Sequence, residues 1–230
     1  MFDPRAPVAL AFDTAGSACS VALARGDETL AHERQQMRHG HAEALLPMVD
    51  RVVAAAGLLP KEIGTIAVTV GPGGFTGIRA GLAAAHGLAL AVGARLVGIS
   101  SFVAVAGAIV KSSMTLLVAL DSRRDDLYVQ LFDARCAPLT DAEAIAPERL
   151  AAWVGNGELA IAGDVVEAAA AALGSRPGLQ CIPNSAPDAL GVLAALRRWP
   201  ERADPMAYPL YLRLPDVSLP KARRSGGRRA

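Results

Sequence analysis

A glycine-rich loop between a short apolar strand and a long small-residue helix constrains this chain most. Residues 65–70 are rich in β-branched types, and residues 71–79 continue as GPGGFTGIR. Glycines placed there let the backbone turn sharply and point several N–H groups at one anion at a helix start. The loop lacks the Gly-Lys-Ser/Thr of a Walker loop, and Thr76 replaces the third glycine of G-x-G-x-x-G. The sequence therefore specifies a tight turn, with Thr76 as N-cap in the simpler interpretation, and leaves phosphate binding open.

Glycine and alanine dominate the helix that is predicted from this loop to residue 92. A glycine costs about 1 kcal/mol relative to alanine in a helix, so several of them need a reason. Close approach of another backbone is that reason, and the approaching element is the chain's own sheet, a partner helix, or both. A second helix is predicted at 41–56, where apolar residues recur every three or four positions. Pro47 predicts a kink or a later start in this helix.

The order of predicted elements restarts near residue 112. The segments VALAFDTAGSACSVALA and LLVALDSRRDDLYVQLF each read as a buried strand ending in Asp, a polar turn and a second strand. The two aspartates, Asp13 and Asp121, are 108 residues apart, which indicates an internal duplication. The alternation of strands and helices predicts an α/β protein with mixed sheets flanked by helices. Strands are expected at 8–14, 19–25, 29–34, 65–70, 95–99, 116–120, 126–132 and 159–162, helices at 101–111, 147–154, 165–173 and 187–198, and an extended segment at 205–214.

Polar residues follow the two strands that end in aspartate. Ligands of α/β sheets bind at the carboxyl ends of strands, where a carboxylate can hold a metal-bound water and a hydroxyl such as that of Thr14 can bond phosphate. Equally, each Asp can bond a backbone N–H of its own turn. The sequence leaves both interpretations open. The residues of this vestigial phosphate or cleft site are Asp13, Thr14, Gly71, Gly73, Gly74, Thr76 and Asp121.

Composition argues against several classes of protein. Hydrophobic residues make up 52% of the 230, yet no apolar run reaches the ~18 residues of a membrane span. The N-terminal residues carry an acid and a proline where a signal peptide has a basic region, so we expect a cytoplasmic protein with no membrane partner. The three cysteines are far apart and form no disulfide framework or zinc knuckle.

Charge is distributed unevenly along the chain. Residues 217–230 hold five cations and no acid, which leaves 18 cations against 22 acids, or −4, for the remainder. Such a body does not present a broad RNA-binding face. A solvated, disordered basic tail is the favoured interpretation of the end of the chain.

No arrangement of residues predicts a catalytic centre or a resident metal or cofactor. The four histidines, all in the first half, include no H-x-x-x-H pair. A G-x-S-x-G nucleophile elbow and a catalytic cysteine context are also missing from the sequence.

Several segments carry a family resemblance. LAFDTAGSACSVAL, VGPGGFTGIRAGLAAAHGLAL, LVALDSRRDDLYVQLFD, HAEALLPMV and the ending YPLYLRLPDVSLPK together resemble the TsaB family. These proteins are the dimerising subunits of the bacterial machinery that makes N6-threonylcarbamoyladenosine at position 37 of tRNA. The match spans nearly the whole chain and is loosest over 134–200. The resemblance implies an actin-like (Hsp70-like) ATPase fold of two RNase H-like halves: residues 1–111, with the glycine loop and interface helices; a degenerate half, 112–214, whose C-terminal part is expected to pack back on the first; and the basic tail, 215–230.

The resemblance also implies a role. The chain would be a non-catalytic scaffold that binds a TsaD-type catalytic paralogue, meets a TsaE-type ATPase through the complex, and contacts tRNA only through the complex. The paralogue's metal-binding histidines are missing here, since the corresponding segment SSFVAVAGAIVK has none. A homodimer in the absence of the partner stays open. The family's contact through its first two helices implies an apolar seam with small residues that admit close helix approach, namely Leu45, Met48, Val49, Val52, Ala80, Ala84 and Gly87.

Two other functions remain as alternatives. The first is a nucleotide-binding or nucleotide-hydrolysing enzyme of the actin-like class, because Asp13, Thr14, Asp121 and the glycine loop would flank the cleft of that fold. Against it, the second half shows no adenine-binding signature. The second and more remote alternative is a peptidase, which would need a nucleophile–base pair or a metal that the sequence does not reveal.

Overall fold

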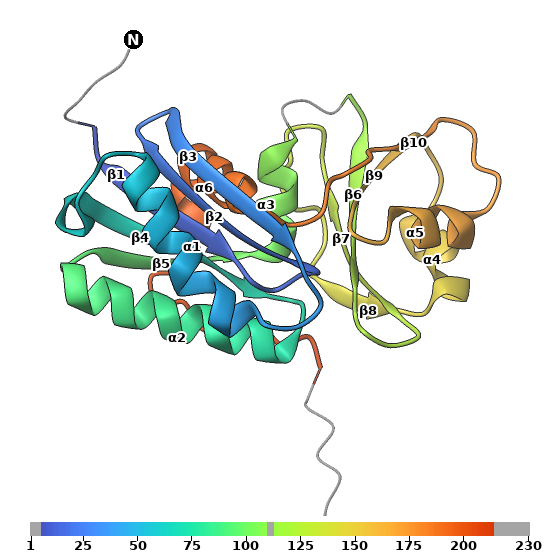
Figure 1. Ribbon diagram of the computed structural model, residues 1–230. Helices are drawn as coiled ribbons and strands as arrows, with labels where there is room; N and C mark the ends of the chain where they lie inside the picture. Colours follow the sequence, from blue (N-terminus) through green and yellow to red (C-terminus); the bar gives the residue numbers. More distant parts are fainter. Residues whose placement is uncertain (1–5, 110–112, 214–230) are drawn as a thin grey trace, which may run out of the picture.

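The computed structural model describes residues 6–109 and 113–213, and shows two sheets flanked by helices (Figure 1). The predicted tail, 215–230, and the predicted boundary at 111/112 lie outside these residues. The strands are β1 (Val8–Asp13), β2 (Ala18–Arg25), β3 (Glu28–Gln36), β4 (Ile63–Gly71), β5 (Arg95–Ser100), β6 (Thr115–Asp121), β7 (Leu127–Phe132), β8 (Glu143–Ile145), β9 (Leu159–Gly163) and β10 (Leu179–Cys181). The helices are α1 (His41–Ala55), α2 (Phe75–Val92), α3 (Ser101–Ala108), α4 (Pro147–Val154), α5 (Val166–Leu173) and α6 (Ala189–Arg198), with short 3₁₀ turns at Pro60–Glu62 and Pro200–Arg202.

The two sheets have the same topology. Their strand orders are β3-β2-β1-β4-β5 and β8-β7-β6-β9-β10. In each sheet the first strand pairs antiparallel with the second and parallel with the fourth, so that β6 corresponds to β1 and β9 to β4. This repetition is what the duplicated sequence pattern predicted, and the predicted α/β fold of two related halves is confirmed.

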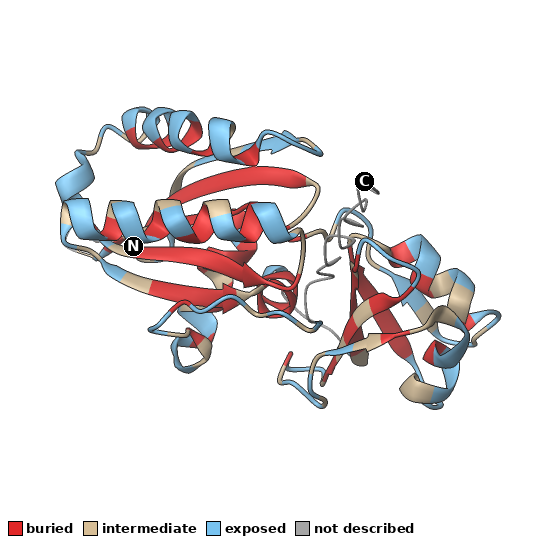
Figure 2. Cartoon of the chain, turned by 90° about the horizontal axis from the view of Figure 1, so that it is seen from below, coloured by how far each residue is buried: buried red, intermediate tan, exposed pale blue. Residues whose placement is uncertain are grey.

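Three hydrophobic cores hold the sheets and helices together. In the first, α1 and α2 cover one face of the N-terminal sheet, where Phe12, Leu45 and Ile78 are among the most deeply buried side chains. A second core fills the space between the two sheets around α3 and α6. In the third, α4 and α5 cover the far face of the second sheet. Figure 2 shows the outcome: the strands are largely red and the outer sides of the helices pale blue.

Helix α6 returns to the N-terminal half although it comes late in the sequence. It packs against β1, β2 and β4, and the amide of Ala189 donates to Ser20 Oγ at 2.9 Å. The carboxylate of Asp188 lies 3.0 Å from His32 Nε2 and 3.3 Å from Arg34 Nε on β3. The C-terminal end of the second half is therefore fixed to the first sheet.

Several helix starts differ from the sequence predictions. Gly74, not Thr76, is the N-cap of α2. Asp188, whose side chain accepts from the amide of Leu190, caps α6, so Pro187 lies before the helix and not in its first position. Helix α1 starts at His41 and continues through Pro47, because its buried side chains hold it on the sheet. The short strands β8 and β10 were missed, since three residues give no readable periodicity.

Helix α2 also passes a length-and-composition test for a membrane span, alone among the helices described. One such helix is weak evidence, because core helices of soluble proteins meet the same criteria. Here its inner side packs on the first sheet, and 33% of the 18-residue window is buried. The rest of this apolar helix faces outward.

Candidate functional site

The β1–β2 turn of the first half is closed by the start of α2. Asp13 is completely buried; its Oδ1 accepts from Thr69 Oγ1 at 2.6 Å and from the amide of Ala15 at 3.2 Å. Thr14 Oγ1 donates to the carbonyl of Gly77 at 2.8 Å, and the Gly74 amide donates to the carbonyl of Ala15 at 2.7 Å. The Thr14 hydroxyl, the Gly74 amide and Asp13 Oδ1, which the sequence suggested for a ligand site, are thus engaged in hydrogen bonds within the chain.

The glycines of this region are explained by the same contact. A Cβ on Gly77 would lie 2.0 Å from the carbonyl oxygen of Thr14, and one on Gly81 would lie 2.4 Å from Thr14 Oγ1. A Cβ on Gly73 would meet the carbonyl oxygen of Ala15 at 2.4 Å. The helix composition indicated close approach of another backbone. At these positions that backbone is the chain's own β1–β2 turn.

Burial changes the acidity of Asp13. Loss of hydration raises the pKa of this carboxyl from 3.8 to about 6, although the hydrogen bond from Thr69 acts in the opposite direction. Its Oδ2 is buried without a hydrogen-bond partner among the described residues. The carboxyl group is therefore buried beneath the β1–β2 turn. Its Oδ1 accepts a hydrogen bond from a backbone amide of that turn, as one of the two interpretations of the sequence expected.

The corresponding turn of the second half is open. Asp121 Oδ1 accepts from the amide of Arg123 at 2.7 Å, and Asp121 Oδ2 lies 3.4 Å from Arg123 Nε. Arg123 has a φ of 64°, a left-handed conformation that this side-chain bond supports. Ser122 Oγ bonds Asp126 within the same turn. Both side chains of the Asp121–Arg123 pair keep more than a third of their surface exposed.

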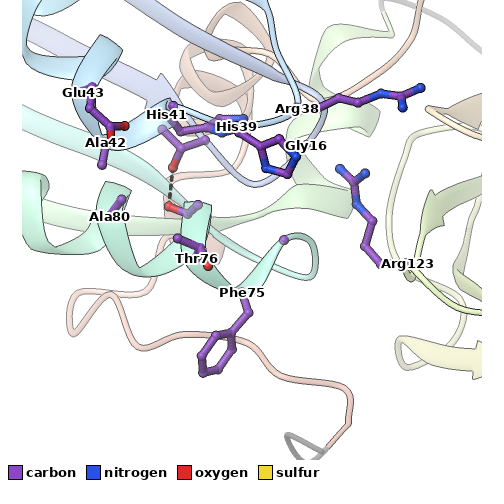
Figure 3. A pocket seen from close by; sticks show the side chains of 14 residues that line it. Gly16, Arg38, His39, His41, Ala42, Glu43, Phe75, Thr76, Ala80 and Arg123 are labelled. Atoms are coloured by element: carbon purple, nitrogen blue, oxygen red, sulfur yellow. Dashed lines mark hydrogen bonds between the residues drawn. The ribbon is translucent and has the colours of Figure 1, made fainter.

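A pocket of ≈ 410 Å³ lies between these two turns (Figure 3). The starts of α1 and α2 form one wall, and neither helix has a side-chain N-cap. Arg38 and His39 enter from the loop before α1, and Arg123 enters from the second half. Of the predicted site residues, Thr14, Gly74, Thr76 and Ala80 line this pocket. Asp121 lines a neighbouring pocket together with Arg38 and Arg123.

Sequence reasoning missed the cationic side of this pocket. Arg38, His39 and Arg123 come from two loops that are far apart in the chain, and only the fold brings them together. Arg123 was visible in the polar turn after β6, but its partners across the halves were not. Among the residues described, no group of His, Cys, Asp or Glu side chains is arranged to hold a metal.

The predicted seam residues of α1 need a correction. Their exposed fractions are 5% or less, and their side chains belong to the core between α1 and the first sheet; they are Leu45, Met48, Val49 and Val52. The apolar residues that recur along α1, and that suggested a partner surface, are therefore buried against the first sheet of the same chain. On α2, Ala80 and Ala84 are half-buried and Gly87 is exposed.

The outward faces of α1 and α2 carry a different set of residues. Leu46 on α1 is 48% exposed and Leu90 on α2 is 87% exposed. Small residues surround Leu90, and a Cβ placed on Gly87 would meet nothing within 4 Å. The exposed small residues of α2 are Ala83, Gly87 and Ala91. Exposed apolar and small residues therefore lie on this face beside exposed polar ones such as Asp50, Arg51 and His86, and no part of the described chain covers them.

Comparison with known proteins gives consistent results. Residues 30–177 match the family model described as "TsaD: tRNA N6-adenosine threonylcarbamoyltransferase". The chain is 39% identical over 121 residues to the tRNA threonylcarbamoyladenosine biosynthesis protein TsaB of Escherichia coli and 36% identical over 122 residues to that of Haemophilus influenzae. These alignments cover 52% of this chain and about half of each relative, 52% and 51% of their lengths. An uncharacterized protein of Mycobacterium tuberculosis is 34% identical over 212 residues, covering 90% of this chain and 92% of that protein.

Solved structures agree on the fold. YeaZ from Pseudomonas aeruginosa superposes with a TM-score of 0.77 at 26% identity and covers 90% of this chain and 100% of that one. Component A of the (R)-2-hydroxyglutaryl-CoA dehydratase of Acidaminococcus fermentans superposes with a TM-score of 0.50 at 13% identity, over 83% of this chain and 96% of that one. The second likeness concerns the fold alone.

Proposed function

Since this chain belongs to the TsaB family, a group related to the TsaD threonylcarbamoyltransferases, we propose that it is a non-catalytic subunit that holds a TsaD-type catalytic protein for N6-threonylcarbamoylation of adenosine 37 in tRNA. In this proposal a TsaE-type ATPase joins through the complex. The complex acts in the cytoplasm, where its tRNA substrate is found.

The observation that carries this proposal is the uncovered outer face of α1 and α2. An apolar helix that buries only part of its surface in its own chain leaves a patch that a partner is expected to cover. Small side chains at Ala83 and Gly87 allow a second helix to approach closely. A TsaD-type protein shares the family model with this chain, which supports the expectation that its equivalent helices pack against this face.

The closed β1–β2 turn supports the non-catalytic part of the proposal. Hydrolysis of a nucleotide in an actin-like cleft requires polar groups that are free to meet phosphate. Here Thr14 Oγ1 is bonded to the carbonyl of Gly77 and Asp13 lies behind the turn, fully buried. Of the seven residues predicted for a vestigial site, Thr14, Gly73 and Gly74 hold the start of α2 against the turn, and Thr14, Gly74 and Thr76 line the pocket.

A calorimetric titration with the TsaD-type protein of the same organism tests the proposed contact. Leu90→Arg replaces the most exposed large apolar side chain of the uncovered face, near the end of α2, by a charged one. We expect the affinity to fall by about 30-fold or more, since a desolvated unpaired charge costs more than about 2 kcal/mol. Ala168→Arg, an equivalent change on the exposed side of α5, is the control and should bind as the wild type does. Val52→Arg is unsuitable, because it would place the guanidinium in the core and unfold the chain.

Equal affinity of Leu90→Arg and Ala168→Arg, with both variants folded, would exclude this face as the contact. A loss in both would place the contact elsewhere or show that added positive charge alone disrupts binding.

A further inference from the structure

Basic side chains from two separate loops line the pocket between the two halves. Arg38 and His39 come from the loop before α1 and Arg123 from the turn after β6; Glu43 is the one acidic residue in the lining, and Asp121 of the neighbouring pocket is paired with Arg123. Figure 3 shows the guanidinium groups of Arg38 and Arg123 at the same side of the opening. Backbone N–H groups at the starts of α1 and α2 add partial positive charge, because neither helix has a side-chain cap.

His41 supplies a second, independent feature. It lines the pocket, only 9% of its surface is exposed, and its Nε2 has no hydrogen-bond partner among the described residues. A buried ring nitrogen without a partner is costly in a folded protein. Because this nitrogen is itself inaccessible, a polar ligand atom in the pocket would supply that partner only after a local rearrangement at the start of α1.

An aromatic platform stands at the rim. The rings of Phe75 and Tyr211 are 5.4 Å apart between centroids, with an angle of 34° between their planes. The guanidinium carbon of Arg79 lies 3.7 Å from the Phe75 centroid, and Arg79 Nε donates to the Tyr211 hydroxyl at 3.2 Å. Phe75 and Tyr211 are 41% and 39% exposed, so both keep aromatic surface available to a ligand.

The platform is held in place by the C-terminal segment. The amide of Leu210 donates to the carbonyl of Val70 at 2.7 Å, and Asp204 bridges to Gly98 of β5. Phe75 belongs both to the pocket lining and to the platform, and Figure 3 shows its ring pointing away from Arg38 and Arg123, so the platform adjoins the pocket on its outer side. The last 14 residues of the sequence contain five cations and no acid.

We propose that this pocket and platform bind an unpaired segment of RNA, with phosphate in the cationic pocket and a base stacked on Phe75 and Tyr211. The inference rests on the proposed function, in which tRNA is the substrate, and extends it by giving this chain direct contacts with the RNA. Anion-binding groups beside exposed aromatic faces match the two chemistries of a single-stranded nucleotide. An acidic peptide would use the pocket but would leave the aromatic faces without a partner. The contact is local, in agreement with the slightly acidic remainder of the chain.

Fluorescence anisotropy with the full chain and a labelled RNA hairpin that carries an unpaired loop tests the proposal. A blunt RNA duplex of the same length is the comparison, and the hairpin should bind more tightly. Phe75→Leu and Tyr211→Leu should each weaken hairpin binding about tenfold and leave its salt dependence unchanged. Arg38→Ala and Arg123→Ala should weaken it about fivefold and reduce the slope of log affinity against log salt by ~0.7 per lost phosphate contact.

Two controls separate the site from other effects. Arg149→Ala on α4 removes the same charge far from the pocket and should bind as the wild type does. A chain ending at Pro220 should lose affinity for hairpin and duplex alike, and should keep its preference for the hairpin, because cations attract the phosphates of any RNA without regard to pairing.

The proposal fails if the wild-type chain binds no hairpin, or if folded Phe75→Leu and Arg38→Ala variants bind it normally. It also fails if hairpin and duplex bind equally and only the truncated chain loses affinity. Binding of the TsaD-type protein by these variants is expected to be normal, and Leu90→Arg should bind RNA normally, so each proposal can fail without the other.

Discussion

The two halves of this molecule share a topology and differ in what covers it. In the first half, the turn after Asp13 is sealed by α2, and the helices over the outer face have 15 and 18 residues. In the second half, the turn after Asp121 is open, and the outer helices α4 and α5 have eight residues each. The longer helices leave large apolar side chains exposed at Leu46 and Leu90, whereas the shorter ones mainly cover their own core.

This difference shows how one duplicated framework can acquire two uses. In the first half, the end of β1 is covered by α2. The contact fixes α2 in place, and in the proposed function the outer face of this helix binds the partner. The second half keeps a polar turn, and Arg123 reaches from it toward the starts of α1 and α2. The same strand–Asp–turn–strand pattern therefore supports packing in one half and an accessible cation in the other.

The largest expected effect comes from opening the sealed turn. Gly77→Ala would place a Cβ 2.0 Å from the carbonyl oxygen of Thr14, and we expect a loss of about 3 kcal/mol or more in the free energy of unfolding, because backbone must move. Urea denaturation measures it. Gly87→Ala on the same helix meets nothing within 4 Å and should raise the free energy of unfolding by about 1 kcal/mol. Similar stability in both variants would show that α2 does not seal the turn.

A second expected effect is a pH dependence of the free energy of unfolding that comes from Asp13. The folded chain keeps the Asp13 proton to about pH 6, whereas the unfolded chain releases it near pH 4. Since the folded state binds more protons between these values, the free energy of unfolding falls as pH rises through this window, by up to about 3 kcal/mol from this group. Asp13→Asn removes that dependence. The difference in stability, variant minus wild type, should therefore rise by up to about 3 kcal/mol between pH 4 and pH 7.

Parallel stability curves for Asp13→Asn and the wild type would mean that Asp13 is hydrated in solution. The comparison of the halves would then lose its central contrast, because both turns would be open.

The smallest effect is expected at the corresponding position of the second half. Asp121→Asn removes an exposed ion pair with Arg123 and keeps an oxygen that can accept from the Arg123 amide, so stability should change by less than about 1 kcal/mol. Thermal unfolding followed by circular dichroism is sufficient to measure it. A loss of stability as large as that of Gly77→Ala would show that the second turn contributes as much to the free energy of unfolding as the first.

Sequence patterns predicted much of the fold because its elements are locally specified. The duplicated strands that end in Asp13 and Asp121, the glycine loop and the helix to Val92 all appeared near their predicted places. Helix starts were less predictable. Thr76 and Pro187 are residue types that favour the start of a helix, but the backbone places Gly74 and Asp188 at the N-cap positions instead.

The candidate site was only partly predictable, for a physical reason. Thr14, Gly74 and Thr76 lie together because they are close to one loop, but Arg38 and Arg123 meet through packing of one half on the other. The four seam residues predicted on α1 are buried in the chain's own core for a related reason: apolar periodicity shows which face of α1 is buried but does not say which element covers it. Met48, fully buried on the first sheet, and Leu46, half exposed, differ by only two positions in the sequence.

The most direct test of the account is the molar mass of the purified chain, measured by light scattering alone and after mixing with the TsaD-type protein of the same organism. The account predicts a one-to-one complex at micromolar concentration and no ATP turnover by this chain alone. The absence of a complex, together with ATP turnover by the isolated chain, would contradict it and would make the region around Asp13 and Asp121 an active site.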